Sequence, residues 1–310
     1  MIKSEKNFFA IRWVSVILAI LCEVAWGSAF PLIKKGYSIF SIEGIASPLL
    51  FGGIRFVIAG SLLLIGSALR DKRLPRLERG KIGGVLALGT VQTGLVYFFE
   101  YVALNYCSGT NSSIVNSIQP FMLTLIACYV FKTEKMSFRK VIGMAIGFAG
   151  IIVCYLGESF GTITFLGEGF IIISSTMFAF GTNFAKRLTN SVDTLLATGF
   201  NLFIGGAELV TIGLLAGGRM VQGTVQGYAV LTVLALISAV CFIIWTLICK
   251  YNPISKIAPF QFVNPISGVV CSAVILGENL MQLKYLFTLF LVSIGIIITN
   301  SAEERKRSAV

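Results

Sequence analysis

The sequence predicts an all-α integral membrane protein of ten transmembrane helices, arranged as two inverted five-helix repeats around a central cavity. Its composition is 56% hydrophobic and only 13% charged, whereas soluble domains carry about a quarter charged residues. Apolar segments recur from Trp13 to Thr299, most of them near the roughly 20 residues that a helix needs to cross a bilayer. The basic residues lie between these segments, which indicates a membrane topology.

Each apolar segment is expected to form one transmembrane helix. The expected ranges are 13–33, 49–69, 81–104, 110–131, 137–156, 166–187, 195–217, 228–249, 257–276 and 283–300. The first segment follows Lys3, Lys6 and Arg12, as the apolar region of a cleaved signal peptide would. Cleavage would leave nine helices and break the first repeat, so we expect this segment to be retained.

The basic residues also predict the orientation. If the N-terminus is cytoplasmic, 20 of the 25 lysines and arginines fall on the cytoplasmic side, four fall outside and Arg55 lies within a span. Cytoplasmic loops are enriched in these residues. We therefore expect both termini, including the tail 301–310, on the cytoplasmic side of the cell membrane. The net charge of +11 then reflects topology and gives no reason to expect a nucleic-acid partner.

The two halves of the chain share a pattern of residues. In the first half these residues are Gln119, Pro120, Glu134 and Gly150, and in the second half Asn264, Pro265, Glu278 and Gly295. The spacing from proline to glycine is 30 residues in both halves, which predicts repeats over 13–156 and 166–300. Since five is odd, the second repeat starts on the opposite side of the membrane, and carriers of this inverted plan bind solute near the midplane between the halves.

Several of these motifs together resemble the drug/metabolite transporter superfamily, EamA type. The resemblance rests on Trp26-Gly27-Ser28-Ala29-Phe30, Arg55-Phe56, the run 101–106, and the stretches from Pro120 to Glu134 and from Pro265 to Glu278. It covers essentially the whole chain. The resemblance implies a secondary-active exporter of amino acids or related small metabolites, with a cavity lined mainly by the first, third, fourth, sixth, eighth and ninth helices and no cofactor.

The first helix carries a second, narrower resemblance. The run Ala19 to Val24 followed by Gly27 is similar to the first helix of small multidrug resistance proteins, in which the glutamate binds a proton and a cationic substrate in turn. One extra residue separates Glu23 from Gly27 here. This resemblance implies proton coupling at Glu23 and, as an alternative function, proton-coupled export of cationic drugs or amines. A channel or a non-transporting scaffold is a third alternative.

Four charged residues fall inside the expected spans: Glu23, Arg55, Glu100 and Glu208. A charge near a helix centre costs about 2.5–3.5 kcal/mol on insertion scales, so each needs a partner, water or a function. Glu23 is predicted to bind a proton or substrate, the alternative being a neutral carboxyl or an ion pair with Arg55. Arg55 is interpreted as a structural or snorkelling residue, with binding of a substrate carboxylate as the alternative. Glu208 is interpreted as a packing residue.

Neutral polar and aromatic residues complete the predicted cavity. The candidate substrate-binding residues are Glu23, Trp26, Gln92, Tyr97, Glu100, Asn116, Gln119, Gln261 and Asn264. Amides can instead bond neighbouring helices, and Glu100 fits a vestibule or a packed interface equally well. Pro120 and Pro265 are predicted hinges, because proline removes a backbone hydrogen bond.

Interfacial anchoring and close helix packing account for other residues. Trp13 and Trp245 are interpreted as anchors at the membrane surface, where tryptophans gather. Gly143, Gly147 and Gly150 form a small-residue face for close helix packing within a monomer or in a homodimer.

The composition argues against catalysis. The chain has no histidine, which excludes Ser-His-Asp triads and HExxH zinc motifs, and no phosphate-binding loop is present. The seven cysteines include no CxxC pair and are expected to be small buried hydrophobes. We therefore expect no enzyme activity, no metal and no cofactor. The expected partners are a small solute, the lipid bilayer and, if transport is proton-coupled, protons.

Overall fold

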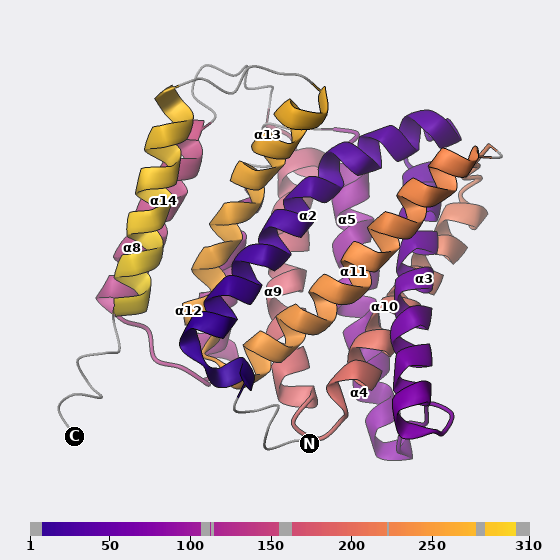
Figure 1. Cartoon of the computed structure of the whole chain (residues 1–310), viewed down its shortest axis with the longest axis horizontal. Helices are drawn as coiled ribbons and strands as arrows, with labels where there is room; N and C mark the ends of the chain where they lie inside the picture. Colours follow the sequence, from indigo (N-terminus) through magenta and orange to yellow (C-terminus); the bar gives the residue numbers. More distant parts are fainter. Residues whose placement is uncertain are drawn as a thin grey trace.

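The computed structural model describes residues 8–106, 112, 115–154, 163–221, 223–276 and 283–301. Within these ranges the regular structure is entirely helical (Figure 1). The start of the fourth expected helix at 110–111, Glu278 and most of the expected cytoplasmic tail lie outside the described residues.

Six helical segments of the described chain are long and apolar enough to cross a membrane. They are α2 (Arg12–Phe40), α3 (Ala46–Asp71), the continuous run of α4 (Arg79–Gly89), η1 (Thr90–Leu95) and α5 (Val96–Ala103), the run of η3 (Phe165–Gly169) and α9 (Phe170–Leu188), α10 (Thr194–Leu215), and α11 (Val225–Tyr251). An all-helical chain with at least these six apolar spans agrees with the predicted fold class.

The remaining helices are shorter in the part of the chain that the structure describes. They are α7 (Gln119–Leu125), η2 (Ile126–Val130), α8 (Phe138–Cys154), α12 (Ile254–Ile257), η4 (Ala258–Phe262), α13 (Val263–Leu276) and α14 (Leu283–Ser301). They occupy the places of the fourth, fifth, ninth and tenth expected helices. The count of ten membrane crossings stays a prediction.

The first helix extends seven residues beyond its expected end at residue 33. Lys34 and Lys35 are exposed but remain helical. The helix ends at a backbone cap and not at the point where its side chains become polar. The cap is Ser41, with a left-handed φ of 49°, and the next amide, that of Ile42, donates to the Tyr37 carbonyl over 2.9 Å. Charged residues near a helix end need not mark that end.

The two predicted hinge prolines both lie in the first turn of a helix. Pro120 occupies the start of α7 directly after a turn at 117–118, and Pro265 follows the 3-10 segment η4 at the start of α13. Proline lacks an N–H group, so the first turn is where it removes no helical hydrogen bond. Each proline therefore coincides with a break in its helix, and its role as a hinge stays a prediction.

Backbone-to-backbone contact holds α3 against α10. A Cβ atom added at Gly53 would lie 2.6 Å from the Val210 nitrogen, and one added at Gly60 would lie 2.4 Å from the Phe203 nitrogen. From the other side, a Cβ at Gly206 would lie 2.7 Å from the Val57 nitrogen. Only glycine allows the helices to come this close, and such contacts are a principal source of helix association in lipid.

The same kind of contact joins α8 and α14, which lie side by side at one edge of the molecule (Figure 1). A Cβ at Gly143 would lie 2.6 Å from the Gly295 carbonyl oxygen, and one at Gly147 would lie 2.5 Å from the Phe262 ring. A Cβ at Gly150 would lie 3.0 Å from the Cβ of Leu291. The small-residue face of α8 thus takes part in close helix packing within the chain.

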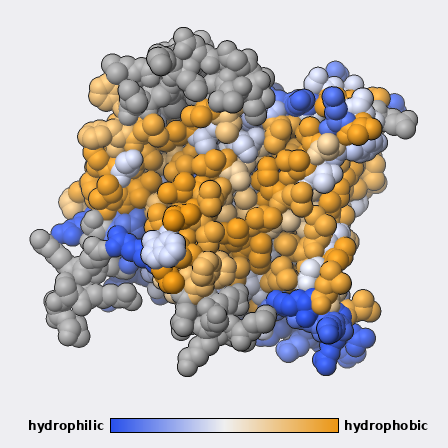
Figure 2. Space-filling model, viewed as in Figure 1, coloured by the Kyte–Doolittle hydropathy of each residue, from blue (hydrophilic) through white to orange (hydrophobic). Residues whose placement is uncertain are grey.

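One end of the bundle gathers the basic residues and is called the basic end below. There, Arg70 forms an ion pair with Asp193 at 3.0 Å, and Lys186 donates to the Asn252 carbonyl over 2.6 Å. Lys250 donates to the hydroxyl of Thr194 over 2.9 Å. Figure 2 shows hydrophilic residues along the lower edge of the molecule and an apolar belt above them, as expected for a protein that crosses lipid.

Glu134 connects distant parts of the chain at the basic end. Its carboxylate accepts the backbone N–H groups of Ile254 and Ser255 and the Ser255 hydroxyl. It also lies 3.3 Å from the Lys140 ammonium, and both side chains are at least 94% buried. A buried ion pair with further hydrogen bonds is costly to break from one side only. Glu134 therefore fixes the segment after η2 to the start of α12.

We predict that Gly143→Val destabilises the protein. The new side chain must displace the backbone of α14, since its Cβ alone would collide with the Gly295 carbonyl, and overpacking of this kind costs about 1–3 kcal/mol. Thermal unfolding of the purified protein measures the loss. Gly66→Val is the matched control, because an added Cβ there meets nothing within 4 Å. An equal shift in both variants would contradict the close packing of α8 on α14.

Candidate functional site

Glu23 lies buried where α2 meets α13. Glu23 is 1% exposed, and its Oε1 atom has no hydrogen-bond partner among the described residues. The Asn264 side chain on α13 is within hydrogen-bonding reach of the carboxyl group, and the Ser267 hydroxyl donates to the Glu23 carbonyl over 3.2 Å. A carboxyl group with a free acceptor atom between two helices can take up a proton or a cationic group.

Gly27, one turn beyond Glu23, brings α2 and α13 together. A Cβ at Gly27 would lie 2.0 Å from the Ser267 hydroxyl and 2.7 Å from the Asn264 carbonyl oxygen. The glycine of the Trp-Gly-Ser motif therefore has a physical role, because any side chain would separate Glu23 from Asn264.

Trp26 is surrounded by aromatic rings from α9 and α11. Its ring centroid lies 5.5 Å from Trp245, 5.6 Å from Phe242 and 6.5 Å from Phe178, all in edge-on arrangements. Edge-on pairs at these distances add to the stability that burial provides. Trp26 itself is half-buried, so it forms part of an aromatic wall one turn from Glu23.

Trp245 differs from its expected role as an interfacial anchor. The residue is 1% exposed and its indole Nε1 atom has no hydrogen-bond partner, so this interpretation is wrong. The sequence places Trp245 near the end of an apolar segment, where an anchor is a reasonable expectation, but α11 turns this side chain inward onto Trp26. Trp13, at 65% exposed, has the exposure that an anchor needs.

The predicted amide residues of the fourth and ninth helices lie in different environments. Asn116 accepts a hydrogen bond from the Ser175 hydroxyl over 2.8 Å. Gln261 is 7% exposed and its Oε1 atom has no partner, whereas Gln119 is half-buried at the start of α7. Gln261 therefore keeps a buried side-chain oxygen that is open to a solute, whereas the Asn116 oxygen already accepts a hydrogen bond.

Gln92 lies in the π-helical segment η1 and bonds two neighbouring helices. Its amide donates to the Thr182 hydroxyl over 3.2 Å, and its carbonyl accepts from the Asn201 amide over 3.0 Å. Thr93 in turn donates to the Asn201 side-chain oxygen over 3.0 Å. A polar network this complete favours the packing interpretation of Gln92 over substrate contact.

Glu208 is also engaged with a neighbouring helix. Its carboxylate accepts the Thr90 hydroxyl over 2.6 Å, and it covers Gly94, where an added Cβ would lie 2.2 Å from its second oxygen. These contacts fit the expected packing role.

Tyr97 and Glu100 share one region with Arg55, which is only 5% exposed. The guanidinium carbon of Arg55 lies 4.3 Å from the Phe56 ring and 5.7 Å from the Tyr97 ring. The Tyr97 and Tyr101 rings are 5.9 Å apart. Arg55 and Glu100 are within electrostatic range of each other, so the structure brings together an arginine, a glutamate and aromatic rings.

Aromatic side chains connect the Glu23 region to the Arg55 region. Phe242 lies 5.6 Å from Trp26 and 6.3 Å from Phe56, and Phe56 lies 4.3 Å from Tyr97. These rings come from α2, α11, α3 and α5 in turn. Side chains of one hydrophobic cluster therefore lie between the polar residues around Glu23 and those around Arg55.

The predicted cavity residues did not include Tyr37 and Tyr101, which lie within electrostatic range of Arg55. Arg55 was visible as a charge within an apolar span, but nothing in the sequence shows which way it faces. Tyr37 and Tyr101 lie within one turn of the ends of α2 and α5, where a tyrosine is as easily explained by the membrane surface.

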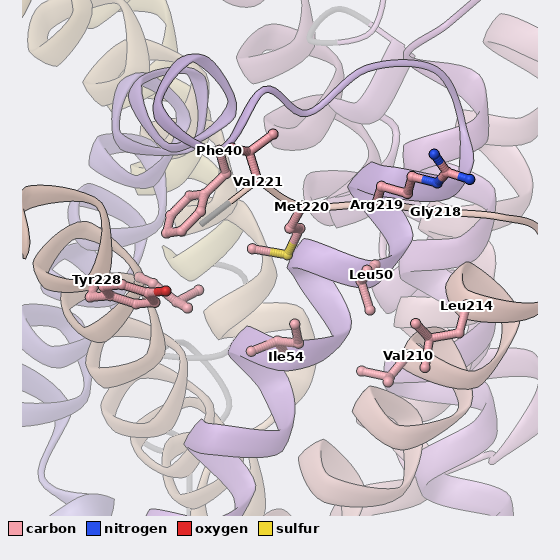
Figure 3. Close-up of a pocket in the computed structure, with 11 residues that line it drawn as sticks. Phe40, Leu50, Ile54, Val210, Leu214, Gly218, Arg219, Met220, Val221 and Tyr228 are labelled. Carbon is pink, nitrogen blue, oxygen red and sulfur yellow. The ribbon is translucent and has the colours of Figure 1, made fainter. Parts of the chain in front are cut away.

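An open pocket lies between α2, α3, α10 and α11 (Figure 3). Phe40, Leu50, Leu214 and Met220 contribute to its mostly apolar lining, with Arg219 at its edge. It contains none of the predicted site residues.

Over the described ranges, no three acidic or cysteine side chains gather in a way that would hold a metal ion. Cys22, Cys128, Cys241 and Cys249 are buried free thiols. This agrees with their expected character as small apolar residues.

Comparison with known proteins identifies the family. The EamA-like transporter family matches the chain twice, at residues 13–156 and 165–301. The chain is 28% identical over 297 residues to an uncharacterized transporter, YvbV, of Bacillus subtilis, covering 95% of this chain and 94% of that protein. It is also 28% identical over 284 residues to an uncharacterized inner membrane transporter, YedA, of Escherichia coli, covering 88% of each.

A solved crystal structure shares the fold, with a TM-score of 0.77 at 17% sequence identity. The alignment covers 91% of this chain and 96% of the other. Because the family match extends over nearly all of the chain, it confirms the resemblance found in the sequence motifs. The protein belongs to the EamA-like transporter family of the drug/metabolite transporter superfamily.

Proposed function

We propose that this membrane transporter is secondary-active and carries a small polar solute by alternating access between the repeats 13–156 and 166–300. The observation that carries the proposal is the position of Glu23, buried where α2 of the first repeat meets α13 of the second. A carboxyl group within an apolar span is costly and is retained where a proton or solute uses it. Carriers built from inverted repeats place their binding sites at such a contact.

Helix packing supports the proposed repeats of five helices each. In this plan α10 corresponds to α3 and α14 to α8, and each of these helices packs against its own counterpart, as helices next to a twofold axis do. Likewise α2 packs against α11 and α13, while its counterpart α9 packs against α5 and α7. The family match to each half of the chain adds independent support.

The basic end is proposed to face the cytoplasm, with both termini on that side. Lysine and arginine accumulate in cytoplasmic loops, and the relative from Escherichia coli is named an inner membrane transporter. The cytoplasmic membrane is accordingly the proposed location, and transport out of the cell the proposed direction.

The proposed solutes are amino acids or related small metabolites. Glu23, Asn264, Trp26 and Gln261 supply a carboxyl group, amides and an aromatic face near the contact between the repeats. Proton-coupled export of cationic drugs or amines is the second candidate, and the free Oε1 atom of Glu23 favours it.

Counterflow in proteoliposomes tests the proposal. A thermal-shift screen of the purified protein against amino acids, amines and nucleotide-like metabolites first identifies ligands. Each ligand should then enter vesicles at a saturable rate and drive counterflow, because a carrier exchanges solute through one alternating site. Flux that neither saturates nor shows counterflow would indicate a channel, and binding without any flux would indicate a scaffold.

We predict that Glu23→Gln leaves the protein folded but removes the pH dependence of transport or binding. Glutamine keeps the shape and hydrogen bonding of the side chain but cannot exchange a proton. Transport rates or ligand affinities, measured at several pH values, report the effect. The nearby thiols Cys22, Cys241 and Cys249 are present in both proteins, so a lost pH dependence is assigned to Glu23. Glu208→Gln is the matched control and should keep the normal pH profile. An unchanged profile in Glu23→Gln would remove this residue from proton coupling.

We predict that Asn264→Ala and Gln119→Ala weaken ligand binding by about tenfold, equivalent to about 1.4 kcal/mol, with little effect on the yield of folded protein. Gln92→Ala should instead lower stability by about 1–3 kcal/mol, because it leaves buried partners on Thr182 and Asn201 unsatisfied. Ligand titration and thermal unfolding separate the two effects. Equal losses of folded protein in all three variants would favour packing roles throughout.

A further inference from the structure

Arg55 on α3 is a buried cation without a polar partner in the described structure. The residue is 5% exposed, its Nε atom has no hydrogen-bond partner, and no ion pair within 4.0 Å involves it among the described residues. A guanidinium group stays charged at every accessible pH. A buried charge that forms no direct ion pair or hydrogen bond is disfavoured, so this position is suited to an anion that arrives from outside the protein.

The rings around Arg55 orient the guanidinium group without neutralising it. It lies 4.3 Å from the Phe56 centroid and 5.7 Å from the Tyr97 centroid. Cation–π contacts of this kind attract the charge to the ring faces, but they accept no N–H hydrogen bond in the manner of a carboxylate. The N–H groups of the guanidinium group can therefore still donate hydrogen bonds to a planar anion such as a carboxylate.

Two tyrosine hydroxyls add further donors to the same region. The Tyr37 and Tyr101 hydroxyls are buried and have no hydrogen-bond partner in the part of the chain that the structure describes, and both lie within electrostatic range of Arg55. Tyr101 packs on Gly52, where an added Cβ would lie 2.5 Å from its hydroxyl oxygen. Tyr37 packs on Phe51 with 5.5 Å between centroids. Three donor groups from α3, α2 and α5 are thus held in place without an acceptor.

Glu100 supplies the opposite charge. Its carboxylate lies within electrostatic range of Arg55, Tyr37, Tyr97 and Tyr101. Among the residues with described side chains, however, it forms no ion pair with Arg55 within 4.0 Å. A cation and an anion that share a buried region without pairing can each bind the opposite charge of a molecule that carries both.

We propose that Arg55, with the Tyr37 and Tyr101 hydroxyls, binds the carboxylate of a small zwitterionic solute, and that Glu100 binds its ammonium group. This inference rests on the proposed transport function and adds to it a second polar site, separate from Glu23. Tyr37 and Tyr101 lie near the ends of α2 and α5 that are remote from the basic end. The aromatic rings from Tyr97 through Phe56 and Phe242 to Trp26 lie between the two sites.

Thermal unfolding of the purified full chain with matched probes tests the site. One series comprises L-phenylalanine, 3-phenylpropionate and 2-phenylethylamine, and a second comprises L-alanine, propionate and ethylamine. In at least one series the amino acid should raise the melting temperature most, the acid less and the amine least. Arg55→Gln should weaken binding of the amino acid and the acid at least tenfold. Glu100→Gln should remove only the advantage of the amino acid over the acid.

Further variants keep the test decisive. Arg219→Gln, which changes an exposed arginine outside the site, should leave every shift unchanged. If Arg55→Gln fails to fold, the pair Tyr37→Phe and Tyr101→Phe retains the rings but should weaken binding of the acid. The proposal is overturned if no probe stabilises the wild-type protein, if the amines act as strongly as the acids, or if the shifts survive in a folded Arg55→Gln variant or in both tyrosine variants.

Proteoliposome counterflow separates this site from the transport function. If L-phenylalanine or L-alanine shows counterflow that Arg55→Gln does not change, transport stands and the Arg55 site is wrong. If the melting shifts depend on Arg55 but no tested solute shows counterflow, the site stands and the proposed transport function is wrong.

Discussion

The close approach of helix backbones at glycines is the constraint on which this structure depends. Lipid removes the hydrophobic drive that joins helices in water, so van der Waals packing and interhelical hydrogen bonds must hold the bundle together. Gly53 and Gly60 bring α3 onto α10, Gly143 brings α8 onto α14, and Gly27 brings α2 onto α13. The contacts of α3 with α10 and of α8 with α14 join helices that correspond in the proposed repeats. They therefore hold the two proposed repeats together at the proposed symmetry axis.

Packing this close divides the buried polar residues into two kinds. Gln92 is satisfied at both ends of its amide by Thr182 and Asn201, and such a network fixes helices in one arrangement. Glu23 and Arg55 are equally buried but keep atoms without partners. In a packed interior an unsatisfied group costs stability, and binding of the proposed proton or solute would offset that cost.

Hydropathy and basic residues were sufficient to predict helical spans, because lipid imposes length and apolarity on every crossing. They could not predict which way a side chain faces, since spans such as α11 are apolar on all sides. Trp245 was therefore assigned to the membrane surface although it is buried. For Arg55 the sequence left a structural role and carboxylate binding as alternatives, because it could not show that the guanidinium group lies against the Phe56 and Tyr97 rings. The end of α2 at Phe40 was missed because its cap depends on the left-handed Ser41.

The two ends of the bundle differ in how their polar groups are satisfied, and this difference bears on the proposed transport cycle. At the basic end, Glu134 binds the start of α12 through backbone and hydroxyl donors, and opening there must break these bonds. Toward the other end, the Arg55 donors form no hydrogen bond within the described residues, so binding the proposed solute would break none there. A ligand shifts a conformational equilibrium only by its differential affinity for the two states. In such a cycle, contacts that a solute gains at Arg55 or Glu23 would have to offset those that Glu134 loses.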